Sequence, residues 1–271
     1  MTVTSSRLAS PATTAPNSPG EVYLRVSAGL VSRTAPWLVL PLRTVLFVLT
    51  QVLAAGALAL AGSQNAWTAS IPWWPVYLIV PNLITLVILA ALTHREGLAY
   101  TDLWKYLPGS SMSPGRSELL TWAALLLAGV PVGGIGFIGA AALLYGGQTP
   151  EFISPLPMWA ALLSLVVMPV SIALVELPAY MGYALPRLEA LTGRRWIPVL
   201  LAVFWLALQH IALPLIFDPR FILYRFISML PIALYIGLVY QRMRRLGPLM
   251  ILHYLADLQL GITVFLLSLP K

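Results

Sequence analysis

Hydrophobic residues follow one another along this chain in long continuous runs that short polar stretches interrupt. Seven of these runs have lengths close to the roughly 20 apolar residues that a helix needs to cross a bilayer. They cover residues 37–61, 73–93, 119–145, 158–185, 196–217, 221–240 and 246–269. Trp37, Trp73, Trp159 and Trp196 stand at run ends, as expected for an aromatic belt at the membrane surface. The pattern predicts an all-α polytopic membrane protein with about seven transmembrane helices.

The residues before the first run divide into two parts. Residues 1–20 are rich in Ser, Thr, Pro and Ala without periodicity, which predicts a disordered N-terminal tail. Residues 21–36 are mildly amphipathic and form a possible helix at the membrane interface. We expect residues 37–271 to form a single transmembrane helical domain. Within it, Gly129 and Gly133 allow a second helix to approach closely, which assigns the third run to helix packing.

Composition and charge agree with a membrane protein. The chain is 59% hydrophobic and only 9% charged, and it has no cysteine, which excludes a soluble domain and any cysteine-based site. Arg43 and Arg225 lie inside runs within about two helical turns of an end, and we interpret both as snorkelling to the interface. Two further basic residues, Arg220 and Lys271, fall on one side of the seven-span topology. Twelve fall on the other side: Arg7, Arg25, Arg33, Arg95, Lys105, Arg116, Arg187, Arg194, Arg195, Arg242, Arg244 and Arg245.

This asymmetry predicts the orientation of the chain. In a cell membrane, the side rich in Lys and Arg faces the cytoplasm. The N-terminus is therefore expected in the cytoplasm and the C-terminus on the outer side of the membrane. The basic loops then face anionic lipid, which accounts for the net charge of +7 without a nucleic-acid partner.

Four ionisable residues interrupt the later runs: Glu176, His210, His253 and Asp257. Such residues are costly inside a membrane, so each is a candidate functional residue. The rise of 1.5 Å per residue places them about 16, 22, 12 and 18 Å from the cytoplasmic edge. His253 and Asp257 are four residues apart and share one helix face. We therefore predict one site shared by three helices.

Two prolines lie close to these residues. Pro178 and Pro214 lack an N–H, so each leaves free the carbonyl four residues earlier, on Leu174 and His210 respectively. Free carbonyls and kinks at membrane depth are tolerated where they line a cavity. Two of the three helices are thus expected to bend near their polar residue.

The four side chains suggest hydrolysis by activated water. A buried Glu with a His can act as general base and acid, while a second His with Asp stabilises an oxyanion or orients the first pair. Alternatively, the same four residues, Glu176, His210, His253 and Asp257, could bind one Zn²⁺. Taken singly, each also has a structural interpretation as a hydrogen-bonded packing residue, and H-x-x-x-D as an intrahelical pair. The matching depth on three helices favours a site.

Residues 155–265 resemble the CPBP family of intramembrane proteases, the CAAX-protease and bacteriocin-processing or ABI-type group. Glu176-Leu-Pro-Ala-Tyr-Met-Gly-Tyr-Ala-Leu-Pro-Arg-Leu is similar to its first motif, E-E-x-x-x-R followed by Gly and an apolar run. Leu206-Ala-Leu-Gln-His210 partly matches its second motif, F-x-x-x-H, and His253-Tyr-Leu-Ala-Asp257 matches its third, H-x-x-x-N or H-x-x-x-D. The order of the motifs and their distribution over three helices also agree.

The resemblance implies an α-helical membrane endopeptidase of the glutamate type that needs no metal or other cofactor. Glu176 and His210 would activate water, and His253 and Asp257 would form the oxyanion site. The substrate would be a membrane-associated peptide or protein.

The chain departs from the family pattern at Leu177 and Met181, which replace the second Glu and the Arg, and at Leu206, which replaces Phe. Positions 177 and 181 are one helical turn apart, so the Glu and Arg of the family pattern could form an ion pair there. In this chain Leu and Met replace both partners of that pair together, which can be energetically neutral. The loss of that pair motivates an alternative, a catalytically inactive membrane scaffold or partner subunit. A third possibility is a proton-coupled transporter, because Glu, His and Asp chains also relay protons.

Overall fold

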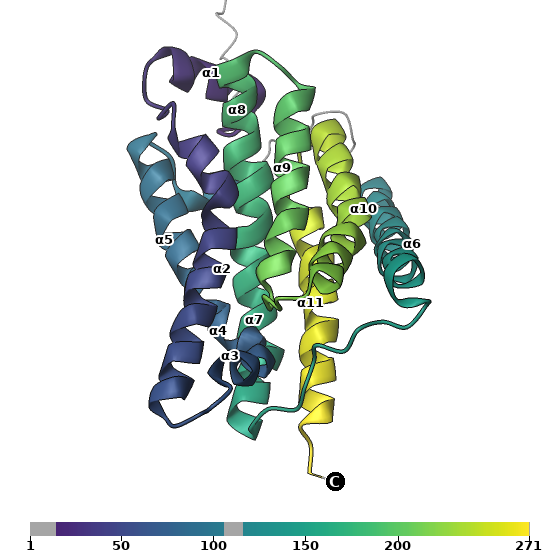
Figure 1. Cartoon of the computed structure of the whole chain (residues 1–271). Helices are drawn as coiled ribbons and strands as arrows, with labels where there is room; N and C mark the ends of the chain where they lie inside the picture. The colour runs from purple at the N-terminus through teal and green to yellow at the C-terminus, as the bar shows by residue number, and fades with distance from the viewer. Residues whose placement is uncertain (1–14, 106–115, 271) are drawn as a thin grey trace, which may run out of the picture.

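The structure, a computed structural model, describes residues 15–105 and 116–270. These residues form helices and no strand, which confirms an all-α polytopic membrane protein. Figure 1 shows the long helices running roughly parallel, with α7 and α8 at the centre. In chain order the elements are α1 (Pro19–Ser27), α2 (Ala35–Leu60), α3 (Ala66–Ser70), η1 (Ile71–Trp73), α4 (Trp74–Tyr77), α5 (Ile79–Arg95), η2 (Tyr100–Leu103), α6 (Arg116–Tyr145), α7 (Met158–Leu177), η3 (Pro178–Ala184), α8 (Leu185–Thr192), α9 (Trp196–Leu208), η4 (Gln209–Ala212), α10 (Pro219–Met243) and α11 (Gly247–Leu267).

The helical segments occur where the hydrophobic runs predict them, but two of them are irregular. In the part of the chain that the structure describes, five helices are long and apolar enough to cross a membrane, and a sixth span results if α3 to α5, bent by 48°, count as one. Pro81 explains the break, because it has no N–H to bond the carbonyl of Tyr77. The fifth predicted run is helical only over Trp196–Ala212, too short to span alone. Its end at Ala212 rather than Phe217 follows from Pro214.

The helix that carries the first motif is the core of the molecule. α7, η3 and α8 form one continuous segment, Met158–Thr192, and every residue from Val175 to Leu188 is buried. A helix that is apolar on all sides is buried on all sides. η3 is a turn of π-helix that contains Pro178 and Gly182. α2, α5, α9 and η2 surround this segment and hold the motif residues in fixed positions.

α6 packs along α10, as its glycines predict, but through a different pair of them. A Cβ on Gly136 would lie 2.2 Å from the carbonyl oxygen of Ser228 on α10, and one on Gly129 would lie 3.4 Å from Tyr235 on α10 and 2.8 Å from Leu252 on α11. A Cβ on Gly133 would meet nothing within 4 Å. The contact therefore uses glycines seven residues apart, two helical turns, rather than the Gly129-x-x-x-Gly133 spacing.

The N-terminal region is anchored to the end of the bundle where α8 ends. Residues 1–14 of the predicted disordered tail lie outside the described residues, while residues 15–18 form a turn that leads into α1. The Asn17 amide donates to the carbonyls of Gly182 (2.8 Å) and Leu103 (3.3 Å) and accepts from Arg187 (3.1 Å). Arg187 is fully buried and donates to both carboxylate oxygens of Glu96.

The two ends of the bundle differ in charge, as the topology predicts. The C-terminal ends of α5, α8 and α10 lie with α1 at one end, and the chain terminates at the other (Figure 1). We call the first of these the α1 end. Most of the basic residues follow or precede helices there, and the charge count predicts that this end faces the cytoplasm.

Candidate active site

Three of the four predicted site residues meet between α7 and α11. Nε2 of His253 lies 2.9 Å from Oε1 of Glu176 and 3.4 Å from Oδ2 of Asp257. The Glu176 side chain is 2% exposed, while those of His253 and Asp257 are 14% and 17% exposed. Because carboxylate oxygens only accept hydrogen bonds when ionised, Nε2 of His253 must carry the proton between them.

His210 lies on η4, directly after Gln209, which shares the Arg43 guanidinium with Glu176. Its Nδ1 is 2.9 Å from the carbonyl oxygen of Leu206, one turn earlier. A carbonyl can only accept, so Nδ1 carries the proton in this hydrogen bond. In the neutral imidazole the lone pair then lies on Nε2, which can accept a proton from water.

Arg43 lies against Glu176, and our interpretation of Arg43 as a snorkelling residue is wrong. Its side chain is fully buried, and its Nη2 donates to Oε2 of Glu176 at 3.0 Å. Nη1 donates to Oδ1 of Asn82 at 2.9 Å, and Nε donates to Oε1 of Gln209 at 2.8 Å. The guanidinium turns inward because a buried carboxylate and two amide oxygens satisfy all of its nitrogens. It joins α2, α5, α7 and η4 at one point.

Arg225 was also interpreted as snorkelling, and it too is buried, at 3% exposure. Its Nε and Nη2 donate to the carbonyl oxygens of His210 (3.2 Å) and Leu213 (2.8 Å). The His210 carbonyl is the one that Pro214 was predicted to free. The corresponding carbonyl of Leu174, freed by Pro178, accepts from the Tyr100 hydroxyl. The Leu174 carbonyl is thus bound by a side chain from another element, whereas the His210 carbonyl also accepts from the backbone N–H of Leu213 at 3.2 Å and is not left free as predicted.

Sequence reasoning missed Arg43, Asn82 and Gln209 as parts of the site. Asn82 also donates to the Ser171 hydroxyl at 2.9 Å, and Gln209 also accepts from the Tyr180 hydroxyl at 3.3 Å. A signal was present, because an amide side chain within an apolar run needs a partner as much as a charge does. Gln209 moreover directly precedes the His of motif two.

Leu177 and Met181, which replace the Glu and Arg of motif one, are both fully buried in the main hydrophobic core. A Cβ on Gly237 would lie 3.9 Å from Cε of Met181, so α10 packs on this position. The structure thus has an apolar pair where the family pattern allows an ion pair.

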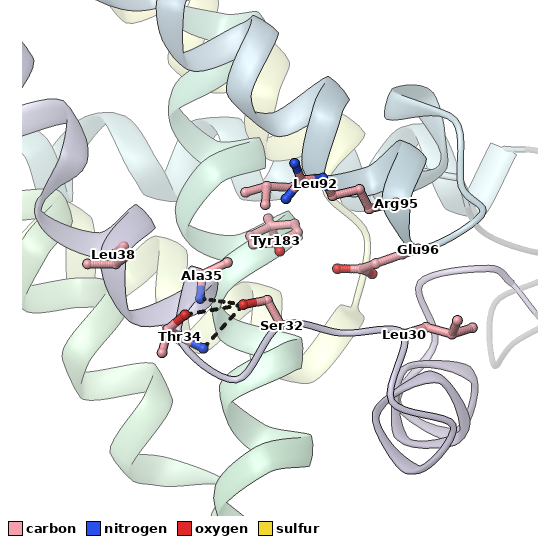
Figure 2. Close-up of a pocket in the computed structure, with 9 residues that line it drawn as sticks. All are labelled: Leu30, Ser32, Thr34, Ala35, Leu38, Leu92, Arg95, Glu96 and Tyr183. Atoms are coloured by element: carbon pink, nitrogen blue, oxygen red, sulfur yellow. Dashed lines mark hydrogen bonds between the residues drawn. The ribbon is translucent and has the colours of Figure 1, made fainter.

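Two cavities near the α1 end are lined by residues outside the polar cluster. Figure 2 shows one of about 140 Å³ at the α1 end, between the start of α2 and the end of α5. Ser32 accepts there from the backbone nitrogen of Ala35 at 3.2 Å, and Glu96 and Tyr183 also line the wall. A second cavity is lined by Arg33, Trp37 and Thr192 among others. Neither includes Glu176, His210, His253 or Asp257, and the side chains of His253 and Asp257 are partly exposed.

The zinc alternative can be tested on the geometry of the candidate ligands. Within residues 15–105 and 116–270, no three His, Asp or Glu side chains are arranged to hold a metal ion. Glu176, His253 and Asp257 instead contact one another, and Arg43 occupies the other oxygen of Glu176. In this conformation these side chains bond to one another and to Arg43, and zinc binding stays a prediction.

Comparison with protein families identifies this region. Residues 157–259 match the family described as type II CAAX prenyl endopeptidase Rce1-like. This segment matches the model of an Rce1-like domain of the CPBP family. The matched segment runs from α7 into α11 and contains all four predicted site residues, and its bounds agree with the predicted region 155–265. No curated protein and no solved structure matches the chain.

Proposed function

We propose that this protein is an intramembrane endopeptidase in which Glu176 and His210 activate the water that hydrolyses a membrane-associated peptide bond. The observation that carries the proposal is the convergence of Glu176, His253 and Asp257 in a segment that matches an Rce1-like family model, with His210 directly after Gln209, which shares Arg43 with Glu176. Ionisable residues up to 81 positions apart that gather in an apolar bundle are a functional-site hypothesis by default.

The reaction follows from the protonation states of the side chains. The water oxygen attacks the carbonyl carbon of the scissile bond and gives its proton to the carboxylate of Glu176 or to Nε2 of His210. That proton then passes to the nitrogen of the leaving amine as the C–N bond breaks. His253, which carries a proton on Nε2 beside both carboxylates, stabilises the negative charge that develops on the carbonyl oxygen.

The substrate class follows from the family described for the domain. We propose a membrane-anchored peptide with a prenylated Cys-aliphatic-aliphatic-X end, cleaved at a site in a cell membrane. No metal or other cofactor takes part in the proposed mechanism.

One observation favours a second candidate, the inactive scaffold. Both oxygens of Glu176 are in contact with cations or imidazole, Oε2 with Arg43 and Oε1 with His253, as in an ion pair that only supports structure. Such a protein would bind another membrane protein tightly and would not depend on the Glu176 carboxylate as a base.

The two candidates predict different results with purified protein in liposomes. Wild type is expected to cleave prenylated Cys-aliphatic-aliphatic-X peptides, and Glu176→Gln and His210→Ala each to lower kcat about 10²- to 10⁴-fold. His94→Ala is the matched control, since His94 is exposed at the end of α5. Mass spectrometry of the products gives the rate and the cleaved bond. Equal cleavage by Glu176→Gln, or no cleavage of any peptide by wild type, would overturn the proposal.

A further inference from the structure

The third motif of this chain lacks the amide that the Asn form of the motif would provide. Asp257 stands at that position, and an ionised carboxylate cannot donate a hydrogen bond to an oxyanion. Its Oδ2 is moreover directed at His253, 3.4 Å away. The site therefore needs another donor if it is to stabilise a tetrahedral intermediate beyond the single proton of His253.

The Gln209 side chain is fully buried, and its orientation is set by its neighbours. Arg43 Nε and the Tyr180 hydroxyl both donate to its oxygen, at 2.8 and 3.3 Å. A guanidinium has no acceptor, so the group that faces Arg43 must be the oxygen. The NH₂ group consequently points the other way, and in the described residues it has no hydrogen-bond partner.

Nε2 of Gln209 is a buried donor without a hydrogen bond in the described residues. The polar atoms across the site are paired instead, with Nε2 of His253 2.9 Å from Oε1 of Glu176 and 3.4 Å from Oδ2 of Asp257. An unpaired buried donor is costly, and a reacting group that arrives during catalysis is one explanation for its retention.

Arg43 also places the carboxamide beside the carboxylate of motif one. Its Nε–H and Nη2–H point from the same edge of the planar guanidinium, and they bind Oε1 of Gln209 and Oε2 of Glu176 respectively. The Gln209 amide therefore lies next to the proposed base, with its NH₂ group free. Its neighbour in the chain, His210, is the proposed partner of that base.

We propose that Gln209 is a catalytic residue whose side-chain NH₂ donates to the oxyanion of the tetrahedral intermediate, in place of the Asn amide absent from motif three. Arg43 and Tyr180 act as positioning residues that hold the carboxamide in this orientation. The inference rests on the proposed peptidase function. Gln209 occupies one of the variable positions of motif two, the x directly before the His.

The test compares Gln209→Glu with wild type on the prenylated peptide. Glu keeps the shape and both oxygen contacts, with Arg43 and Tyr180, but replaces the NH₂ donor by an acceptor. Loss of one oxyanion donor lowers kcat about 10²- to 10³-fold, and KM is expected to stay within about threefold because the interaction forms only in the transition state. Gln148→Glu, at an exposed position, is the matched control and should leave both constants unchanged.

A second variant covers the case in which Gln209→Glu does not fold. Tyr180→Phe removes one of the two donors that orient the carboxamide, and loss of one hydrogen bond is expected to lower kcat about fivefold. Wild-type kcat in a folded Gln209→Glu, or in Tyr180→Phe if the first variant is unfolded, overturns the inference. If Glu176→Gln is inactive in the same assay, only the role of Gln209 has failed. If Glu176→Gln is active, the proposed function has failed with it.

Discussion

Arg43 is the residue whose removal should affect the fold most strongly. It is fully buried and binds Glu176, Asn82 and Gln209 through three nitrogens. Arg43→Met keeps most of the volume but leaves the Glu176 carboxylate buried without its ion-pair partner. Breaking a buried pair in this way costs about 3–5 kcal/mol of unfolding free energy.

The double variant Arg43→Met/Glu176→Leu should recover most of that loss. A buried ion pair replaced by apolar residues of similar volume is often neutral, and this chain already has such a pair at Leu177 and Met181. The two substitutions are therefore expected to be strongly non-additive, with the double variant losing far less stability than the sum of the two single effects.

Denaturant unfolding in micelles, followed by far-UV circular dichroism, measures both quantities. Arg194→Met is the matched control, because Arg194 is exposed, and its effect should stay within about 0.5 kcal/mol. The reasoning is refuted if Arg43→Met is as stable as Arg194→Met, or if the double variant loses the sum of the two single effects.

Two further predictions concern packing and orientation. Gly136→Ala should lower the melting temperature, because its Cβ would lie 2.2 Å from the backbone oxygen of Ser228, whereas Gly133→Ala has open space and should be neutral or slightly stabilising; equal melting temperatures would contradict the α6–α10 contact. Since the chain has no cysteine, single Cys substitutions report topology directly. A Cys at Gln148 should react with an impermeant maleimide in intact cells, while one at Arg194 should be protected until the cells are opened, and the reverse pattern would invert the predicted orientation.

The hydrophobic pattern predicted the helices well because a bilayer demands about 20 apolar residues per crossing, and few sequences satisfy that by chance. It failed at the short fifth segment, since apolar composition continues to Phe217 although Pro214 prevents the helix from doing so. The second predicted segment was likewise continuous in hydrophobicity but bent in structure.

The candidate site was predictable in part. Glu176, His253 and Asp257 stand out because charge is rare in such a chain, and the helical rise places them at similar depth. Arg43 was assigned to the interface because it lies close to a helix end. That criterion does not consider whether the Arg43 side chain points toward lipid or toward the other helices. Its partners Asn82 and Gln209 come from distant segments, and only the tertiary structure brings them together.

The Asn17 contacts have a consequence for the order in which the molecule is assembled. Asn17 binds the carbonyl of Gly182, which is 165 residues further along the chain. At a synthesis rate of about 5–20 residues per second, that carbonyl is made on the order of ten to thirty seconds after Asn17. During that interval the N-terminal segment has none of these contacts. Its docking is therefore a late event, which can occur only after the helix that carries Glu176 has been made.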